Sequence, residues 1–481
     1  MDKHILSFLK KQAYIDGQWV GEPKMPVLNK ATGEEIARVP DLGAAETKQA
    51  IAAAEAAFAT WSKTLAKERS NLLRRWYNLI MENADALAAL LTAEQGKPLA
   101  EAKGEIIYGA SFVEFFAEEA KRVYGETIPT HKGDARVVVV KQPIGVVGAI
   151  TPWNFPNAMI TRKVTPALAA GCTVVCKPAE DTPLSALALA ELAHQAGIPK
   201  GVFNVVTTAR PEIVGGELTS SPVVRAITFT GSTEVGKLLM RQSADTVKKV
   251  SLELGGNAPF IVFDDADLEK AVAGAMMSKY RNAGQTCVCA NRLFVHDKVY
   301  DTFAEMLATE VRKLKVGAGT EAGVTQGPLI NTQAIEKVEE HVKDAVAKGA
   351  KVLTGGKRHE RGGTFFEPTI LANVTPDMRV SREETFGPVA PLFRFKTDEE
   401  VVKLANSTEY GLACYFFSRD LGRVWRVAEA LDFGIIGINE GIIGSEAVPF
   451  GGVKESGLGR EGSHHGMEEF LEMKYMLMGG L

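Results

Sequence analysis

The spacing of apolar residues changes along the first third of the chain, and the change marks different secondary structures. Residues 12–40 have the pattern of short strands and turns, and Asp16-Gly17 lies between two β-prone runs, which is a hairpin signal. From Ala44 to about Leu91, apolar residues recur at spacings of three and four, which predicts helices. Residues 101–123 predict another amphipathic helix, whose aromatic residues we expect to pack in the core.

From residue 136 onward, short apolar strands alternate with helices. The strands are predicted at 136–141, 143–150, 173–176, 202–206, 226–229 and 249–253, and the helices at 158–170, 184–197, 212–218 and from Glu234. Such alternation is typical of a doubly wound, mostly parallel sheet, which binds ligands at the carboxyl ends of its strands. A second α/β series runs from Pro259 to about Gly459.

Size and composition narrow the class of protein. A chain of 481 residues is too long for one ordinary core, so two or three domains are expected. The net charge of -4, without a basic block, disfavours nucleic acid and anionic membrane surfaces as partners. The uncharged run 142–161 contains prolines and asparagines that disfavour a membrane span. The N-terminus has no signal-peptide pattern.

The cysteines and histidines predict a reduced protein without a metal site. Five cysteines without framework spacing favour free thiols in a cytoplasmic compartment. No cysteine and histidine set has zinc spacing.

One cysteine lies in a loop-like segment between a helical pattern and a β-prone run. Cys287 follows Asn-Ala-Gly-Gln-Thr, with Arg281 upstream and Arg292 downstream. Guanidinium groups beside a cysteine favour its thiolate, which is the nucleophilic form. A buried structural thiol is the alternative from this stretch alone.

Three polar signals follow predicted strands of the first α/β series. Asn154 lies in a proline-flanked turn, where its amide could meet an oxyanion or serve only as a turn residue. Lys177 and Glu180 form either a loop ion pair or a ribose site, since a carboxylate accepts ribose hydroxyls and repels a 2′-phosphate. Gly231-Ser232 leads into a helix whose free N–H groups could hold a pyrophosphate, although the G-x-G-x-x-G spacing is absent.

Two glutamates complete the set of candidate residues. Glu253 ends an apolar strand before two glycines, and burial there would raise its pKa and suit it to act as a general base. A structural ion pair is the alternative for Glu253. Glu384 precedes a Gly-Pro turn and by itself reads as a surface acid.

Taken together, the motifs resemble those of NAD(P)-dependent aldehyde dehydrogenases over essentially the full length. The motifs are Thr151–Pro156, Lys177–Glu180, Phe229–Ser232, Leu252–Gly256, Gly284–Cys287, Glu384–Pro388 and Pro449–Gly457. The resemblance implies an α/β fold with a Rossmann-like cofactor domain (1–122 and 141–253), an α/β catalytic domain (254–459) and a small β oligomerisation arm (123–140 and 460–481). A homo-oligomer, dimer or tetramer, is therefore expected.

The resemblance also implies a role for each matching residue. Cys287 would be the nucleophile, Asn154 with the Cys287 N–H the oxyanion hole, and Glu253 the base that activates the deacylating water. The cofactor would be bound by Trp153, Asn154, Lys177, Glu180, Gly231, Ser232, Leu254 and Glu384. Because Glu180 faces the adenosine ribose in this reading, NAD is expected to be preferred over NADP.

Within this family, the segments Asn154–Arg162, Gly284–Cys289 and Gly457–Gly462 resemble those of succinate-semialdehyde dehydrogenases. That resemblance implies that Arg162 and Arg281 bind the distal carboxylate of the substrate. Gly444 stands where the subfamily has a carboxylate-binding serine, and the adjacent Ser445 is a candidate replacement.

Several alternatives remain open at this point. Because Gly444 leaves extra room, glutarate semialdehyde is a competing substrate. A CoA-acylating dehydrogenase and a non-catalytic relative are the other readings. A reducible disulfide between Cys287 and Cys289 that switches activity off is a further hypothesis.

Overall fold

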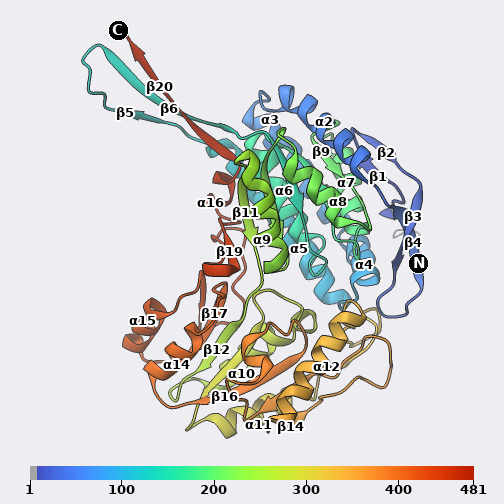
Figure 1. The fold of residues 1–481 in the computed structure, drawn as a ribbon, viewed down its shortest axis with the longest axis vertical. Helices are drawn as coiled ribbons and strands as arrows, with labels where there is room; N and C mark the ends of the chain where they lie inside the picture. The colour runs from blue at the N-terminus through green and yellow to red at the C-terminus, as the bar shows by residue number, and fades with distance from the viewer. Residues whose placement is uncertain (1–7) are drawn as a thin grey trace.

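Two large β-sheets, a three-stranded sheet and a two-stranded hairpin organise the chain in a computed structural model that describes residues 8–481 (Figure 1). The predicted α/β fold with a small β arm is confirmed. The first sheet has the order β19-β11-β10-β7-β8-β9-β1-β2. Its strands are β1 (Ala13–Ile15), β2 (Gln18–Val20), β7 (Val146–Ile150), β8 (Thr173–Lys177), β9 (Phe203–Val205), β10 (Val224–Thr230), β11 (Lys249–Glu253) and β19 (Gly457–Leu458).

The five strands β7 to β11 are parallel, and their order defines where a ligand can bind. Strands β8 and β9 lie on one side of β7, whereas β10 and β11 lie on the other. The order in which successive strands are added to the sheet therefore reverses between β7 and β10. Connections that diverge from such a switch point leave a crevice at the carboxyl ends of the strands.

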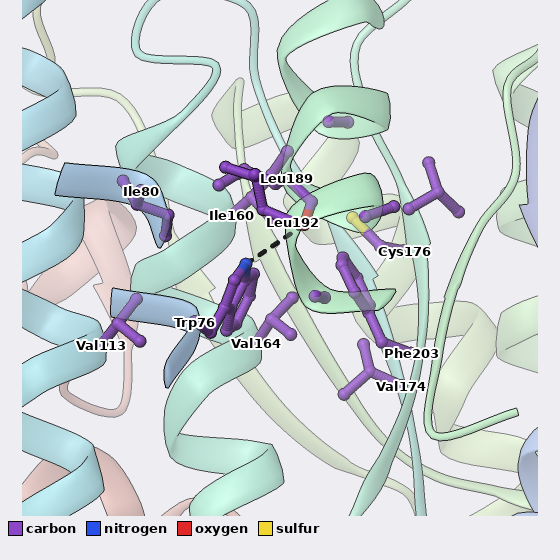
Figure 2. Close-up of a cluster of buried hydrophobic side chains, with 14 of the residues drawn as sticks. Trp76, Ile80, Val113, Ile160, Val164, Val174, Cys176, Leu189, Leu192 and Phe203 are labelled. Carbon is purple, nitrogen blue, oxygen red and sulfur yellow. Dashed lines mark hydrogen bonds between the residues drawn. The ribbon is translucent and has the colours of Figure 1, made fainter. Parts of the chain in front are cut away.

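The helices of this first unit bury a large apolar core. Figure 2 shows Trp76 within it, fully buried, with its Nε1 donating a hydrogen bond of 3.1 Å to the Leu189 carbonyl. Phe203 of β9 packs 5.9 Å from the Trp76 ring. The helices are α2 (Ala44–Trp61), α3 (Ala66–Glu82), α4 (Ala84–Gln95), α5 (Leu99–Glu119), α6 (Ala158–Ala170), α7 (Leu184–Gln195), α8 (Pro211–Ser220) and α9 (Thr233–Ser243).

The second sheet has the order β14-β15-β16-β13-β12-β17-β18, and only β14 runs antiparallel to its neighbour. Its strands are β12 (Ala258–Val262), β13 (Ala290–His296), β14 (Lys351–Thr354), β15 (Thr369–Ala372), β16 (Val389–Phe395), β17 (Ala413–Phe417) and β18 (Ile435–Ile438). Its helices are α10 (Leu268–Tyr280), α11 (Tyr300–Val311), α12 (Thr332–Ala347), α13 (Arg379–Arg382), α14 (Asp398–Asn406) and α15 (Leu421–Ala430).

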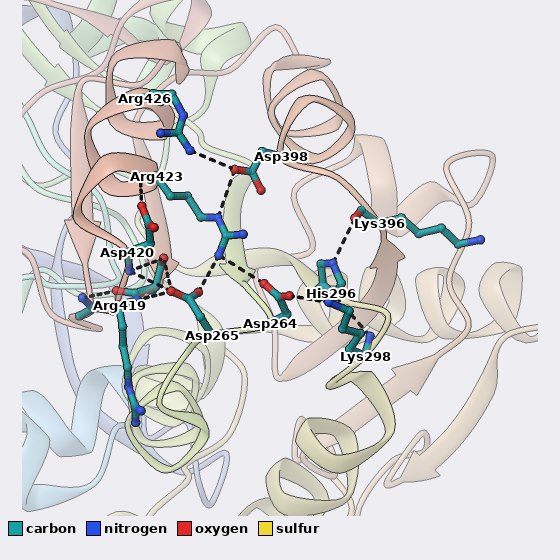
Figure 3. A network of polar contacts seen from close by, with 12 residues as sticks. Asp264, Asp265, His296, Lys298, Lys396, Asp398, Arg419, Asp420, Arg423 and Arg426 are labelled. Atoms are coloured by element: carbon teal, nitrogen blue, oxygen red, sulfur yellow. Dashed lines mark hydrogen bonds and ion pairs between the residues drawn. The ribbon is translucent and has the colours of Figure 1, made fainter.

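A polar network joins the last two of these helices to the end of β12 (Figure 3). Arg423 on α15 contacts Asp265 at 2.7 Å and Asp398, the first residue of α14, at 3.1 Å. Its guanidinium also lies 4.7 Å from the centre of the Phe263 ring. One half-buried arginine thus connects α14 and α15 to an inner strand of the second sheet.

The third sheet forms an arm that extends from the body and carries the C-terminus at its tip (Figure 1). Strand β20 (Leu471–Gly479) pairs antiparallel with β6 (Ala135–Pro143), which also pairs with β5 (Glu126–Ile128). A short helix, α16 (His465–Glu468), precedes β20. Exposed apolar side chains of the arm include Met473 and Tyr475.

Most elements occur where the sequence predicts them, with two differences. The helical region from residue 44 to 91 is divided into the three helices α2, α3 and α4. Strand β19 lies inside the expected catalytic range 254–459, yet it pairs with β11 of the first sheet. The predicted hairpin is confirmed, because Asp16 and Gly17 both have the positive φ angles that its tight turn requires.

The remaining hairpin joins β3 (Pro23–Leu28) to β4 (Glu35–Pro40). Within residues 8–481, none of the helices has the length and apolar character needed to cross a membrane.

Candidate active site

The loops at the switch point of the first sheet carry the predicted site residues. Asn154 follows β7, Gly231 and Ser232 follow β10, and Glu253 ends β11. The Ser232 hydroxyl accepts a hydrogen bond of 3.3 Å from the Val235 N–H and so caps α9. Parallel strands therefore bring these residues to one edge of the sheet.

The loop that carries Cys287 connects α10 to β13 and is strained. Asn282 and Ala283 have φ angles of 51° and 53°, which side chains other than glycine rarely adopt. The Asn282 amide offsets part of this cost, since Nδ2 donates to the Asn154 carbonyl at 3.0 Å and to the Gln285 carbonyl at 3.2 Å. At Gly284 a Cβ would lie 2.2 Å from the Gly387 carbonyl oxygen, so the loop needs glycine there.

Two cavities meet at Cys287. One has a volume of about 290 Å³ and the other about 480 Å³, and both are lined by Asn154, Thr230 and Cys287. The larger cavity lies against the loops after β7, β10 and β11, and the smaller one extends between α5, α6 and the loop 441–444. The cysteine thus has access to two separate ligands.

Besides Asn154, the larger cavity contains five of the residues expected to bind the cofactor. These are Trp153, Gly231, Ser232, Leu254 and Glu384. Glu384 Oε1 accepts a hydrogen bond of 3.2 Å from the Gly256 N–H, and burial raises the pKa of this carboxyl to about 7. The Thr230 hydroxyl is buried without a partner among the residues described. A carboxylate for ribose hydroxyls and the N-terminus of α9 for a pyrophosphate fit a dinucleotide.

Lys177 and Glu180 lie farther along the same edge and do not line either cavity. Lys177 Nζ is 2.6 Å from Glu180 Oε1. The lysine is buried, whereas the glutamate side chain is 37% exposed. Both alternatives from the sequence, an ion pair and a ribose site, are compatible with this placement.

The upstream Arg281 acts on the Cys287 thiol in the expected direction, but burial opposes it more strongly. Burial raises the pKa of Cys287 to about 12, and the opposing effects of Arg162 and Arg281 are smaller. Arg292 takes no part, because it is buried and donates to the carbonyls of Asn257 and Ala405. The raised pKa keeps the Cys287 thiol protonated at neutral pH.

Asn154 is held from several sides. Its Nδ2 donates to the Gln285 carbonyl at 3.1 Å, and Lys97 Nζ donates to its main-chain oxygen at 2.7 Å. Lys97 also forms a buried ion pair of 2.6 Å with Glu105, which accepts hydrogen bonds from two N–H groups at the start of α6. These contacts fix the loop that aims the amide at the cavity beside Cys287.

Glu253 differs from its charged neighbours because its carboxylate has no partner. It is 3% exposed, and neither oxygen forms a hydrogen bond with any residue that the structure describes. Burial and the nearby Glu461 raise its pKa well above 4.5, against the effects of Arg162 and Lys163. Glu253 lies beside Gly451, where a Cβ would come within 3.0 Å of Oε1, and does not line either cavity in this conformation.

Arg162 and Arg281 both line the smaller cavity. Arg162 is buried and stacks 3.8 Å from the Phe450 ring centre. Its Nε lies 2.6 Å from Glu461, which also pairs with Lys163, yet its Nη2 is buried without a partner among residues 8–481. Arg281 forms no ion pair within the same range, so a ligand anion has two sets of free donors.

The structure does not bring Ser445 to this cavity. Its hydroxyl donates to Glu446 at 3.2 Å and accepts from the Ala447 N–H, whereas the neighbouring Gly444 does line the cavity. The backbone there points the serine along the loop, so its use for the substrate would require the loop to shift.

Cys289 is buried away from both cavities. Its sulfur lies 3.3 Å from Nζ of Lys279, which is itself fully buried. All five cysteines are free. The disulfide between Cys287 and Cys289 stays a prediction. In the described part of the chain, no cluster of three His, Cys, Asp or Glu side chains could hold a metal ion.

Three residues of the site have no role in the interpretation of the sequence. Lys97 pairs with Glu105 and Glu461 pairs with Arg162, and both contacts depend on the folded structure. Glu461 lies in the C-terminal segment Gly457–Gly462 used for the resemblance. Tyr108 lines the smaller cavity from α5, and its position among the aromatic residues of that helix favoured a core role.

The fold, in which two cavities meet at Cys287, is that of an oxidoreductase of the aldehyde dehydrogenase type. The aldehyde dehydrogenase family profile matches residues 19–476, and the chain belongs to this family. It acts as an NAD(P)-dependent enzyme, as the resemblance implies.

Known proteins of this family resemble the chain over nearly its whole length. It is 64% identical to a glutarate-semialdehyde dehydrogenase from Pseudomonas aeruginosa, with 98% of each chain covered. It is 63% identical to the succinate-semialdehyde dehydrogenase [NADP(+)] of Escherichia coli, again with 98% of each covered. The crystal structure of succinate-semialdehyde dehydrogenase from Burkholderia pseudomallei superposes with a TM-score of 0.97 at 63% identity, covering 98% of both chains. These relatives share one class of activity, and the chain is accordingly an aldehyde dehydrogenase that acts on semialdehydes.

Proposed function

We propose that the protein oxidises succinate semialdehyde to succinate with NAD. The observation that carries this proposal is the pair of arginines in the smaller cavity. Arg281 has no ion-pair partner in residues 8–481 and Arg162 has a buried, unpartnered Nη2, while Cys287 lines the same space. A short substrate with an aldehyde at one end and a carboxylate at the other fits this arrangement of one nucleophile and two cations.

Catalysis begins with the attack of Cys287 on the aldehyde carbon. Because burial keeps the thiol protonated, its proton passes to solvent water as the C–S bond forms. The resulting thiohemiacetal places its oxyanion beside Asn154, whose second amide N–H is not used by the Gln285 carbonyl. A nicotinamide held in the larger cavity would supply the hydride acceptor, and loss of the hydride from this adduct would leave a thioester on Cys287.

Glu253 then serves as the base for hydrolysis of the thioester. A carboxyl with a raised pKa is a stronger base than an exposed glutamate, and its unpartnered oxygens are free to accept a proton. The side chain has to turn from Gly451 toward Cys287 to reach the attacking water. A CoA-acylating enzyme would need no such base, which favours release of the free acid.

Glutarate semialdehyde is the second candidate substrate. Gly444 lines the smaller cavity without a side chain and leaves room for one more methylene. One methylene discriminates by only about 1–3 kcal/mol. The arginines would also hold a sulfonate, so a sulfonated aldehyde belongs in the same test.

The proposed substrate class is tested by initial rates with succinate semialdehyde, glutarate semialdehyde, a sulfonated aldehyde, butanal and pentanal. Removing one charge-assisted hydrogen bond costs about 1.5–3 kcal/mol, so Arg281→Gln should lower kcat/KM for the semialdehydes about 10-fold to 150-fold. The rates with butanal and pentanal should change little. Arg225→Gln, at an exposed position, is the control. Equal losses for charged and uncharged aldehydes would contradict the proposal.

The preference for NAD rests on Glu180. Its carboxylate lies 2.6 Å from Lys177 at the end of β8, where it would accept hydroxyls of the adenosine ribose and repel a 2′-phosphate. Glu180→Ala should therefore raise kcat/KM for NADP relative to NAD. A wild-type enzyme with the higher kcat/KM for NADP would overturn this part of the proposal.

The arm supports a homo-oligomer as the working form. Its strands expose Met473, Tyr475 and Leu477 on a sheet that extends from the body. Apolar side chains on an extended sheet favour burial against a second copy. Sedimentation of the protein with and without residues 471–481 tests this, and a monomeric full-length chain would contradict it.

Free cysteines are in keeping with the predicted cytoplasmic location.

A further inference from the structure

Tyr108 faces the smaller cavity from the middle of α5. Its ring packs edge-on against Phe112 at 5.0 Å, and the Arg162 guanidinium lies 5.6 Å from the same Phe112 ring. Its hydroxyl forms no hydrogen bond within residues 8–481. A tyrosine hydroxyl that lines a pocket without a partner is available to a ligand.

Charged groups of both signs, Arg162, Arg281 and Glu461, act on this hydroxyl. Burial raises the pKa of Tyr108, while Arg162 and Arg281 act in the opposite direction. The hydroxyl therefore keeps its proton at neutral pH and acts as a donor. Both arginines line the same cavity as Tyr108, so the hydroxyl shares the space in which the distal carboxylate is expected.

Gly444 lies directly opposite the hydroxyl. A Cβ at this position would lie 3.0 Å from Tyr108 Oη and 3.6 Å from Cζ, which is tighter than ordinary contact. The backbone of Gly444 is not in the left-handed region, so its conformation does not require glycine. The effect of glycine here is to keep the space in front of the Tyr108 hydroxyl open.

We propose that the Tyr108 hydroxyl is a third donor to the distal anion of the substrate. It would replace the serine hydroxyl that the subfamily resemblance places at position 444. The donor thus comes from α5 instead of the loop, and Gly444 is what gives the substrate access to it. This inference rests on the proposed function, because it concerns the same carboxylate.

The test compares Tyr108→Phe with the wild type on succinate semialdehyde, glutarate semialdehyde and the uncharged butanal. Loss of one hydrogen bond to a charged group should lower kcat/KM for both semialdehydes about 10-fold to 100-fold, mainly through KM. The rate with butanal should stay within about twofold, which also shows that the variant is folded. Tyr77→Phe, on α3 and outside both cavities, is the matched control.

A rescue variant makes the test specific. In Tyr108→Phe/Gly444→Ser the new hydroxyl meets a ring without Oη, so crowding is relieved and the lost donor is restored. This double variant should recover at least part of the semialdehyde kcat/KM. Unchanged semialdehyde kinetics in Tyr108→Phe, or an equal loss with butanal, would overturn the role of Tyr108.

The result also separates this inference from the proposed function. If Arg281→Gln loses its selectivity for semialdehydes but Tyr108→Phe keeps it, the substrate class stands and Tyr108 is only part of the cavity wall. If neither variant alters the ratio of semialdehyde to butanal rates, the proposal of a carboxylated substrate fails as well.

Discussion

Replacing Glu253 by glutamine separates the two halves of the proposed reaction. The amide has nearly the same volume as the carboxylate, so the 3% exposed site should remain packed. Glutamine cannot accept a proton from water. We therefore expect formation of the thioester on Cys287 to continue, with release of one equivalent of reduced cofactor per site, while hydrolysis becomes slow.

The size of the effect follows from the environment of the carboxylate. A positioned general base contributes about 10²-fold to 10⁴-fold, which corresponds to about 3–5 kcal/mol. Both oxygens of Glu253 are unpartnered within the described chain, so no other residue holds the carboxylate back from this role. The steady-state kcat of Glu253→Gln should fall by this factor, and the amplitude of the first turnover should be retained.

The pH dependence gives an independent check. Burial and Glu461 raise the pKa of Glu253 above 4.5, so the wild-type rate should fall as pH is lowered through this raised value. Stability follows the opposite direction. Because folding raises the pKa of this carboxyl, the free energy of unfolding of the protein decreases as pH rises from about 4.5 through the folded-state pKa. Glu253→Gln should therefore gain more stability over the wild type at pH 9 than at pH 5.

The assay is rapid mixing of enzyme, NAD and semialdehyde, with absorbance of the reduced cofactor followed over the first turnover and in steady state. Cys287→Ser is the control, since it should lose both phases. A steady-state rate within a few-fold of the wild type would refute the role of Glu253. Loss of the first turnover together with the steady state would show that the residue acts before the thioester.

Three further predictions concern charges around the site and the second sheet. Glu461→Gln should move the acidic limb of kcat to lower pH, because Glu461 raises the pKa of Glu253; an unshifted limb would contradict this. Lys97→Met leaves the Glu105 carboxylate buried without its cation and should cost about 3–5 kcal/mol in urea unfolding, part of which Lys97→Met/Glu105→Gln should restore. Arg423→Met should lower the unfolding free energy by about 1–3 kcal/mol, and a loss below 0.5 kcal/mol, roughly that of a surface substitution, would argue against the network of Figure 3.

Local patterns were sufficient to predict most of the fold. The helix 158–170 and the strand 249–253 occur at the predicted residues. The helix has an apolar pattern of helical spacing and is followed by a glycine, and the strand is an apolar run that ends at Glu253. Such signals depend only on neighbouring residues in the sequence. Strand ends in a parallel sheet fall on one edge, so the neighbourhood of Asn154, Gly231 and Glu253 was predictable from their positions after strands.

Pairings between distant segments could not be predicted in this way. The sequence placed Arg162 in the substrate site, but nothing local shows that Glu461 holds one side of its guanidinium. The thiol of Cys287 illustrates the same limit, because sequence proximity to Arg292 suggested activation, and the fold directs that guanidinium to backbone carbonyls. Charge effects depend on side-chain direction and burial, which the spacing of residues does not specify.

The pattern of unpartnered atoms distinguishes positioning groups from reacting groups in this site. Lys97 and Glu105 are fully buried and satisfied by each other and by backbone groups, which suits parts that must not move. Glu253 and Arg162 keep buried polar atoms without partners, although leaving such atoms unpaired costs about 1–3 kcal/mol each. A folded protein can keep a buried polar atom unpaired at a functional site, because a ligand or a proton that binds there later supplies the missing partner. In the proposed reaction, the oxygens of Glu253 accept a proton from water and Nη2 of Arg162 donates to the carboxylate of the substrate.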